Sequence, residues 1–270
     1  MRWLISTDGT ERSQRAAEFA SKFLRPEKDQ AILLGVVSNG NPEDVEESLE
    51  FIHQLLKGLV VRRTMREEEI TTAIELEAQS EHVEMAVYGS RGRHGITSLL
   101  LGSVAARLAH DRPCSVMVVR DQPQPVKRIL VGISLSPRRS ATIEMAGKLA
   151  QAVGAEVAVL HVMSQLALTD KASTGPLNMT AEEAIAHGTT EGEILVETVQ
   201  FLEKMGVHAV PIIRHGLVMD ETLEEIETGN YGLVVIGAHA ALQNIPWSAW
   251  LMEDVAKDIL MNTRCPLVIV

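Results

Sequence analysis

The sequence has 270 residues, of which 46% are apolar and 23% are charged, and its formal net charge is −11. This length suffices for two domains of about 130 residues with separate hydrophobic cores, and the composition is typical of a globular protein. Because the negative charge repels phosphate backbones, it argues against general nucleic-acid binding, and any anionic ligand must be held by local geometry.

Short apolar runs alternate with amphipathic segments through the first half of the chain. The apolar runs predict strands, which lie at 2–7, 31–38, 59–65, 83–89 and 115–120. The segments between them predict helices near 10–24, 42–57, 67–80 and 103–110. Strands joined by crossover helices predict a mainly parallel, doubly wound α/β sheet with right-handed crossovers.

The same succession of strands begins again after a proline-rich linker, "DQPQPVK", at 121–127. The predicted strands of the second half lie at 128–134, 155–163, 207–215, 231–239 and 265–270. The repeat predicts two tandem, Rossmann-like, five-stranded parallel sheets of strand order 3-2-1-4-5, in domains 1–122 and 127–270. We expect the insertion at 164–192 to form a long loop with a short helix, and its sequence indicates no chemistry.

This strand order also predicts where a ligand would bind. In open parallel sheets, ligands lie beyond the carboxyl ends of the strands where the winding reverses, here between the first and fourth strands. Asp8 and Gly9 follow the first strand, and the glycine-containing stretch 89–92 follows the fourth. Glycines let backbone N–H groups approach an anion, and Ser103 would begin a helix whose N-terminus carries partial positive charge. The pattern predicts a phosphate-binding cradle.

Each of these features has a simpler structural interpretation when taken alone. The stretch 89–92 is compatible with a tight turn between strand and helix. Asp8, with Glu11 three residues later, fits a capping box, and Ser103 fits an ordinary helix cap. The ligand hypothesis is favoured because all of them fall at one predicted crevice.

The glycine spacing matches neither the P-loop nor the dinucleotide fingerprint, which disfavours a P-loop motor and a dehydrogenase. The motif instead runs Gly89, two residues, Gly92, nine residues, Gly102-Ser103, and "STDGTERS" at 6–13 accompanies it. This arrangement resembles the ATP-binding signature G-2x-G-9x-G-[S/T] of the universal stress protein family. The resemblance extends over both repeats, so the chain looks like a tandem universal stress protein.

The resemblance implies a binding role for particular positions. Asp8, with Thr7 beside it, would contact the adenosine moiety, and a backbone group at Val36 would receive the adenine edge. The glycine loop and the hydroxyl that follows it would hold the ribose and phosphates, with a divalent ion such as Mg on the phosphates. The sequence shows no metal site formed by protein side chains alone. The implied ATP-binding residues are Thr7, Asp8, Val36, Gly89, Ser90, Gly92, Gly102 and Ser103.

The second repeat departs from this pattern at nearly every matching position. Its replacements are Ser134 for Asp8, Leu135 for Gly9, Ala240 for Gly92, Glu253 for Gly102 and Asp254 for Ser103. Carboxylates where phosphates would lie oppose nucleotide binding, so we expect one ATP per chain, in the first repeat. Trp247 and Trp250, behind Pro246, would fill this second crevice or serve ordinary packing or an interface.

The predicted function is that of an ATP-binding, nucleotide-regulated stress-response module. Binding is favoured over catalysis because the sequence offers no P-loop lysine and no identifiable general base, although slow hydrolysis stays open. The alternative is a nucleotide-independent signalling or structural adaptor. An ATP-consuming enzyme of a related fold would need a catalytic motif, and none is readable.

Partners and location follow from the remaining features. The apolar fifth strands, 115–120 and 265–270, predict pairing of the two repeats within the chain, and a homodimer stays open. Neither nucleic acid nor membrane is an expected partner, and no protein partner is indicated. Two cysteines, Cys114 and Cys265, are too few for a disulfide framework, and no secretory leader or apolar run of about 18 residues is visible. We therefore expect a cytoplasmic protein with buried, unreactive thiols and a structural role for His161.

Overall fold

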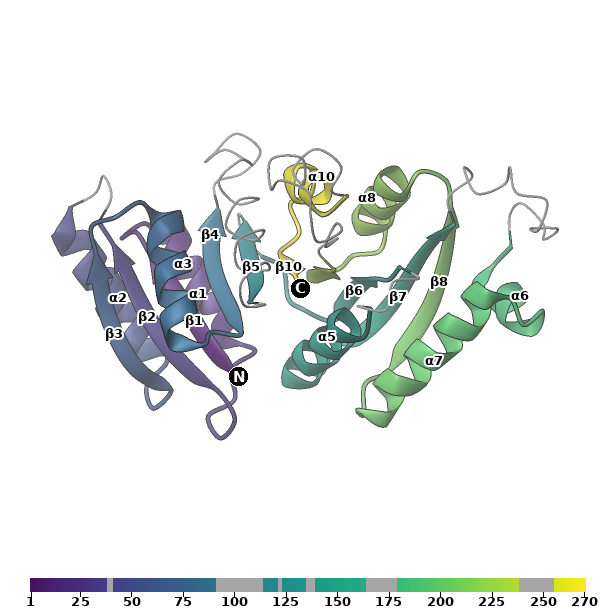
Figure 1. Cartoon of the computed structure of the whole chain (residues 1–270), viewed down its shortest axis with the longest axis horizontal. Helices are drawn as coiled ribbons and strands as arrows, with labels where there is room; N and C mark the ends of the chain where they lie inside the picture. Colours follow the sequence, from purple (N-terminus) through teal and green to yellow (C-terminus); the bar gives the residue numbers. More distant parts are fainter. Residues whose placement is uncertain (38–40, 91–113, 121–122, 135–138, 164–178, 238–254) are drawn as a thin grey trace. The chain divides into compact units, whose positions relative to one another are not determined.

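The computed structural model describes residues 1–37, 41–90, 114–120, 123–134, 139–163, 179–237 and 255–270. These residues belong to two compact units (Figure 1). The first contains Met1–Gln124 with Ala238–Lys257, of which 255–257 are described, and Arg264–Val270; the second contains Pro125–Gly237 with Asp258–Thr263. Within the described part of the chain, no helix is long and apolar enough to cross a membrane.

The first unit is a sheet with helices on both faces, as predicted for a doubly wound fold. Its elements are β1 (Arg2–Thr7), α1 (Glu11–Ser21), β2 (Gln30–Val36), α2 (Pro42–Leu55), β3 (Val60–Arg66), α3 (Ile70–Glu81), β4 (Met85–Ser90), β5 (Ser115–Arg120) and β10 (Leu267–Ile269). The strand order β3-β2-β1-β4-β5 is the predicted one. Figure 1 shows α3 on one face of this sheet and α1 with α2 on the other. The predicted helix at 103–110 lies outside the described residues.

The second unit repeats the central part of this topology. Its elements are β6 (Arg128–Gly132), α5 (Arg139–Val153), β7 (Glu156–Met163), α6 (Ala181–Ala186), α7 (Thr190–Lys204), β8 (Ala209–His215), α8 (Val218–Thr228) and β9 (Leu233–Ile236). The order β9-β6-β7-β8 corresponds to 4-1-2-3 of the predicted order, and β6 is parallel to β9 and to β7, as β7 is to β8. A further helix, α10 (Val255–Asn262), precedes β10.

The prediction of two entirely parallel five-stranded sheets is corrected by the last strand. β10 lies antiparallel to β5, with Leu267 opposite Val118 and Ile269 opposite Val116. The sheet is therefore mixed, with mostly parallel neighbours. The physical reason is that β5 would otherwise expose an apolar edge, and all six of its residues are buried. The expected pairing of the two terminal strands is thus present.

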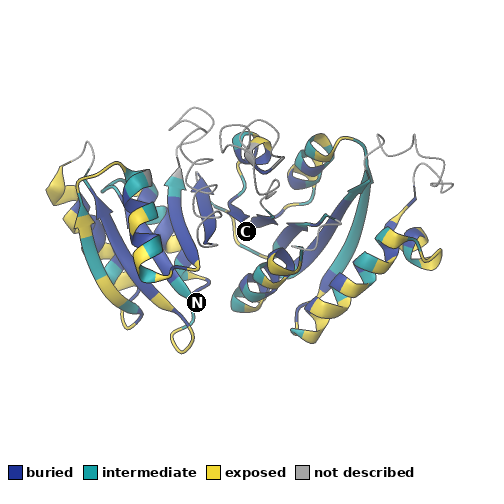
Figure 2. Cartoon of the chain, viewed as in Figure 1, coloured by how far each residue is buried: buried dark blue, intermediate teal, exposed yellow. Residues whose placement is uncertain are grey.

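Hydrophobic burial in the sheets explains why these segments form strands. Trp3, Leu4 and Ile5 of β1 are almost inaccessible to solvent, as are the middle residues of β2 and β6. Figure 2 shows the strands of the sheets largely in dark blue, whereas the helices also carry teal and yellow. Continuous apolar strands covered by half-exposed helices are typical of parallel sheets. The core of each unit therefore lies between its sheet and its helices.

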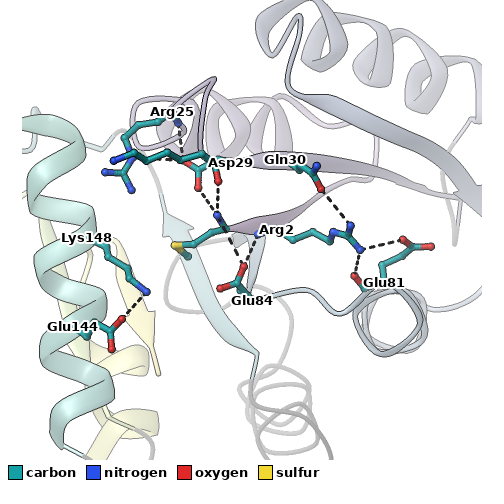
Figure 3. A network of polar contacts seen from close by, with 10 residues as sticks. Arg2, Arg25, Asp29, Gln30, Glu81, Glu84, Glu144 and Lys148 are labelled. Carbon is teal, nitrogen blue, oxygen red and sulfur yellow. Dashed lines mark hydrogen bonds and ion pairs between the residues drawn. The ribbon is translucent and has the colours of Figure 1, made fainter.

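The internal duplication extends to side-chain contacts at the start of each repeat. Arg2 Nη1 donates to the carbonyl oxygen of Glu81 at 2.8 Å (Figure 3), and Arg128 Nη1 donates to that of Gly229 at 2.7 Å. Both arginines begin a central strand, and both acceptors lie where the helix before the fourth strand ends. An arginine at the corresponding position of each repeat thus links the helix to the strand.

A buried carboxylate fixes the beginning of β1 in the first unit. Asp29 is only 5% exposed; its Oδ1 accepts from the Met1 amino group at 2.8 Å and its Oδ2 from the Arg25 N–H at 2.7 Å (Figure 3). Burial raises the pKa of Asp29, but the ammonium group and the amide outweigh it, so the pKa lies below its ordinary value. The carboxylate therefore stabilises the fold in its charged form.

We predict that Asp29→Asn lowers the free energy of unfolding by about 2 kcal/mol at neutral pH, because the ammonium group and the amide lose a charged acceptor. A depressed folded-state pKa stabilises the protein above the ordinary carboxyl pKa, and this contribution is lost as the pH falls through the folded-state pKa. Urea denaturation should therefore show the deficit shrinking below about pH 4. Glu27→Gln, in the same loop but exposed, is the control. A deficit that does not change with pH would contradict the assignment.

Candidate functional site

The predicted switch point is present at the carboxyl ends of β1, β2 and β4. β1 pairs with β2 on one side and with β4 on the other, all in parallel. Thr7, Val36 and Ser90 are the last residues of these three strands. The structure therefore brings Thr7, Asp8, Val36, Gly89 and Ser90 to one edge of the sheet. Gly92, Gly102 and Ser103 lie outside the described residues.

Asp8 does not cap the helix that follows, which corrects the capping-box interpretation. The N-cap of α1 is Thr10, whose side chain accepts from the Ser13 N–H. Asp8 Oδ1 instead accepts from the Thr10 N–H at 3.1 Å and from Thr10 Oγ1 at 2.6 Å. Within the described part of the chain, the other oxygen, Oδ2, accepts no hydrogen bond. One oxygen of this carboxylate is thus used to build the turn, and the other receives no donor from the described residues.

Gly9 is required by the turn between Asp8 and Thr10. Its φ of +80° lies in the left-handed region, which only glycine enters without strain. A Cβ atom here would also lie 2.9 Å from the Asp44 carbonyl carbon and 2.9 Å from the Val45 nitrogen, both in α2. The turn that carries Asp8 therefore packs directly against the first turns of α2.

Gly89 allows a second close approach, between β4 and α1. A Cβ atom at Gly89 would lie 2.7 Å from the Arg12 carbonyl oxygen and 3.1 Å from Ser13 Cα. Gly89 lies within β4, which continues to Ser90, so it does not form a tight turn. The packing alone accounts for a glycine at this position. A role of Gly89 in binding a ligand stays a prediction.

A buried set of hydroxyl groups, from Thr7, Ser13 and Ser48, lies beneath the Asp8 turn. Of these three residues, only Thr7 was predicted from the sequence to belong to the site. Thr7 Oγ1 lies 2.8 Å from Ser13 Oγ and 2.6 Å from Ser48 Oγ. The Gly9 N–H donates to the same Thr7 oxygen at 3.2 Å. Thr7 and Ser48 are fully buried, and Ser13 nearly so. Ser48 lies on α2, 41 residues away, and a lone serine on a helix gives no sequence signal for such a contact.

Val36 contributes backbone rather than side chain to this edge of the sheet. Its side chain is buried, and the next residue, Val37, donates its N–H to the Arg66 carbonyl oxygen at 2.8 Å. The Arg66 side chain binds Glu77 through Nε at 3.1 Å and Nη2 at 2.9 Å. Glu77 is fully buried, so the charge next to Val36 is neutralised within the unit.

The second repeat builds the same strand ends from different residues. The register places Ile133 and His161, one residue beyond Gly132 and Leu160, where the first repeat has Thr7 and Gly35. Ile133 carries no hydroxyl, and the ring nitrogen Nδ1 of the buried His161 lies 3.3 Å from the Ile133 carbonyl oxygen. This contact gives His161 the structural role that we expected. The remaining predicted replacements and tryptophans lie outside the described residues; they are Leu135, Ala240, Pro246, Trp247, Trp250, Glu253 and Asp254.

Neither cysteine is suited to nucleophilic or metal chemistry. Burial raises the pKa of Cys114 and of Cys265 to about 12, so both thiols stay protonated at neutral pH. Both are free. No group of three or more potential metal ligands occurs among the residues that the structure describes. The thiols therefore behave as small apolar side chains.

Comparison with known proteins gives consistent matches. The model of one family, described as the Universal stress protein family, matches residues 1–120 and 125–270. A universal stress protein of Mycobacterium tuberculosis (strain ATCC 25618 / H37Rv) is 32% identical over 95 residues. That match covers 34% of this chain and 30% of the relative, so the chain matches about a third of the relative's length.

Solved structures match at lower sequence identity. A universal stress protein from Archaeoglobus fulgidus DSM 4304 has a TM-score of 0.62 at 15% identity, covering 99% of this chain and 95% of that chain. Another from Archaeoglobus fulgidus, solved in complex with dAMP, has a TM-score of 0.38 at 19% identity and covers 54% of this chain and 98% of its own. The first of these likenesses shows a shared fold.

We predict that Gly9→Ala destabilises the protein more than Gly58→Ala does. The two glycines have similar φ values, +80° and +87°, but a Cβ atom at Gly58 would have no neighbour within 4 Å. Gly58→Ala should cost only the backbone strain, about 1 kcal/mol, whereas Gly9→Ala should cost a further 1–3 kcal/mol, roughly, for displacing α2. Thermal or urea denaturation measures both. Equal losses would show that α2 does not constrain the turn.

Proposed function

Because the chain belongs to the universal stress protein family, we propose that it is an ATP-binding stress-response module with one nucleotide site, in the first repeat. The observation that carries the proposal is the Asp8 carboxylate. It lies at the switch point of the sheet, one oxygen is held by Thr10, and the other accepts nothing from the described residues. A carboxylate oxygen in that position suits a ligand with hydroxyl or amino donors, as adenosine has.

The remaining parts of the nucleotide would be bound mainly by backbone. The adenine edge would meet the backbone at Val36, whose side chain is buried. The phosphates would meet N–H groups of the stretch from Gly89 to Ser103, which carries the complete signature in the sequence. Mg on the phosphates would supply positive charge. Backbone donors suit this role because the chain as a whole is acidic and Arg66, next to Val36, is already paired.

The second repeat would not bind nucleotide. Its first strand ends in Ile133 and Ser134, so it offers no carboxylate at the position of Asp8. Glu253 and Asp254 replace the glycine and serine at the phosphate side, and their charges would repel phosphate. One nucleotide per chain follows.

We propose binding rather than turnover as the role, because the sequence contains neither a P-loop lysine nor an identifiable general base. ATP would act as a switch or as a structural ligand. A second candidate, a signalling or structural adaptor that does not use nucleotide, is favoured by Gly89, because close packing on α1 accounts for that glycine without a ligand. Nucleotide content of the purified protein separates the two.

We predict a stoichiometry of one ATP per 270-residue chain by calorimetry on nucleotide-free protein with Mg. ATP at 100 times its dissociation constant should add about 2.7 kcal/mol to the stability of the folded state, which a thermal-shift titration would detect. A flat titration would support the adaptor, and a ratio near two would show that the second repeat binds as well.

We further predict that Asp8→Ala and Gly102→Glu each weaken ATP binding, whereas Asp254→Ala leaves it unchanged. Asp8→Ala removes the acceptor for the adenosine moiety, which should cost about tenfold or more in affinity. Gly102→Glu places a negative charge where the phosphates would pass. Full binding by the Asp8 and Gly102 variants would exclude the site.

A further inference from the structure

The buried hydroxyl groups beneath Asp8 form a chain with a single direction of hydrogen bonding. Ser13 Oγ donates to the Thr10 carbonyl oxygen at 2.7 Å, which uses its only proton. Ser13 Oγ must therefore accept the hydroxyl proton of Thr7. Because Thr7 has then donated its only hydroxyl proton, Thr7 Oγ1 must accept from Ser48 Oγ. All contacts are satisfied together only in the order Ser48 to Thr7 to Ser13 to the Thr10 carbonyl.

This chain connects α2 to the residue that holds Asp8. Thr10 receives the end of the chain at its carbonyl oxygen and donates its N–H and its hydroxyl to Asp8 Oδ1. The Gly9 N–H, between Asp8 and Thr10 in the sequence, also donates to Thr7. Both sides of the turn are therefore tied to one buried oxygen, Thr7 Oγ1, and through it to Ser48.

The second repeat forms the same strand end without a hydroxyl at the position of Thr7. The second repeat builds the corresponding strand end with Ile133, a β-branched apolar residue, in place of Thr7. Burying polar hydroxyls costs free energy that their hydrogen bonds only offset. The first repeat has both Asp8 and this set of hydroxyl groups. The second repeat has Ser134 in place of Asp8 and no hydroxyl in place of that of Thr7.

We propose that Ser48, acting through Thr7 and Ser13, is a positioning residue that aims Oδ2 of Asp8 at the ribose hydroxyls of the bound nucleotide, and so sets the preference for ligands that carry those hydroxyls. The inference rests on the proposed function, because it needs a nucleotide at Asp8. Ser48 itself is fully buried and touches no ligand. Its effect depends on the orientation of the turn.

The test compares ATP with 2′,3′-dideoxy-ATP, which lacks both ribose hydroxyls, in calorimetric titrations of the full chain. The native protein should bind ATP about tenfold or more tightly than the dideoxy compound, as expected for hydrogen bonds to a charged group. Ser48→Ala should reduce that ratio to roughly threefold or less, mainly by weakening ATP binding, because one linking hydrogen bond is lost. Its affinity for the dideoxy compound should hardly change.

Thr7→Val provides a second variant that keeps the side-chain shape and should reduce the ratio as Ser48→Ala does. Thr198→Val is the matched control, because Thr198 is equally buried but donates only to Ile194 of its own helix, α7. The control should keep the native ratio.

Four outcomes would overturn the inference. Equal weakening of both nucleotides by Ser48→Ala and Thr7→Val would mean a merely structural role, and an unchanged ratio in both variants would mean no role. A native protein that binds ATP without preferring it to the dideoxy compound would overturn the positioning role and leave the proposed function standing. Absence of ATP binding in the native protein would overturn both.

Discussion

The absence of side chains at Gly9 and Gly89 is the constraint on which the candidate site depends. At Gly9 the turn after β1 packs on α2, and at Gly89 strand β4 packs on the first turn of α1. Any Cβ atom would force these elements apart, because the neighbouring atoms belong to helix backbone rather than to flexible side chains. The two close approaches bring α1 and α2 to the strand ends where Asp8 lies. The glycines therefore shape the site before any of them contacts a ligand.

Close packing also decides which polar groups are buried. Once α2 lies against the turn, the Ser48 hydroxyl is sealed from water and must find a partner in the protein. Thr7 supplies it, and Ser13 completes the set. At the corresponding strand ends the second repeat has Ile133 and, on the neighbouring strand, the buried His161, whose Nδ1 lies 3.3 Å from the Ile133 carbonyl oxygen. The repeats thus share a framework of strands and anchoring arginines but differ in the polarity beneath the crevice.

The sequence predicted the framework better than the details of the site. Periodicity placed β1 and β5 at their observed bounds and gave the neighbours of β1, because buried strands and crossover helices constrain topology strongly. The capping-box alternative for Asp8 was wrong because its spacing does not show which residue enters the helix; the left-handed Gly9 moves the cap to Thr10. The contact of Asp8 with adenosine stays a prediction. Ser48 was missed because its contact with Thr7 depends on tertiary packing. The antiparallel β10 was not foreseen because the apolar run at 265–270 carries no mark of strand direction.

Two arginines near the strand ends, one in each repeat, are engaged in ion pairs. Arg66 ends β3 and binds Glu77, eleven residues later; Arg214 occupies the corresponding place in β8 and binds Glu225 at the same spacing. Both carboxylates lie on the helix that follows the strand. Since the repeats otherwise differ around their strand ends, a pair present in both serves the shared fold, by holding that helix against an edge strand. These two arginines are therefore committed to structure, and neither offers an unpaired charge to a phosphate. In a chain with eleven more negative than positive charges, aligned N–H groups at strand ends and helix N-termini are a source of positive potential that does not depend on these two side chains.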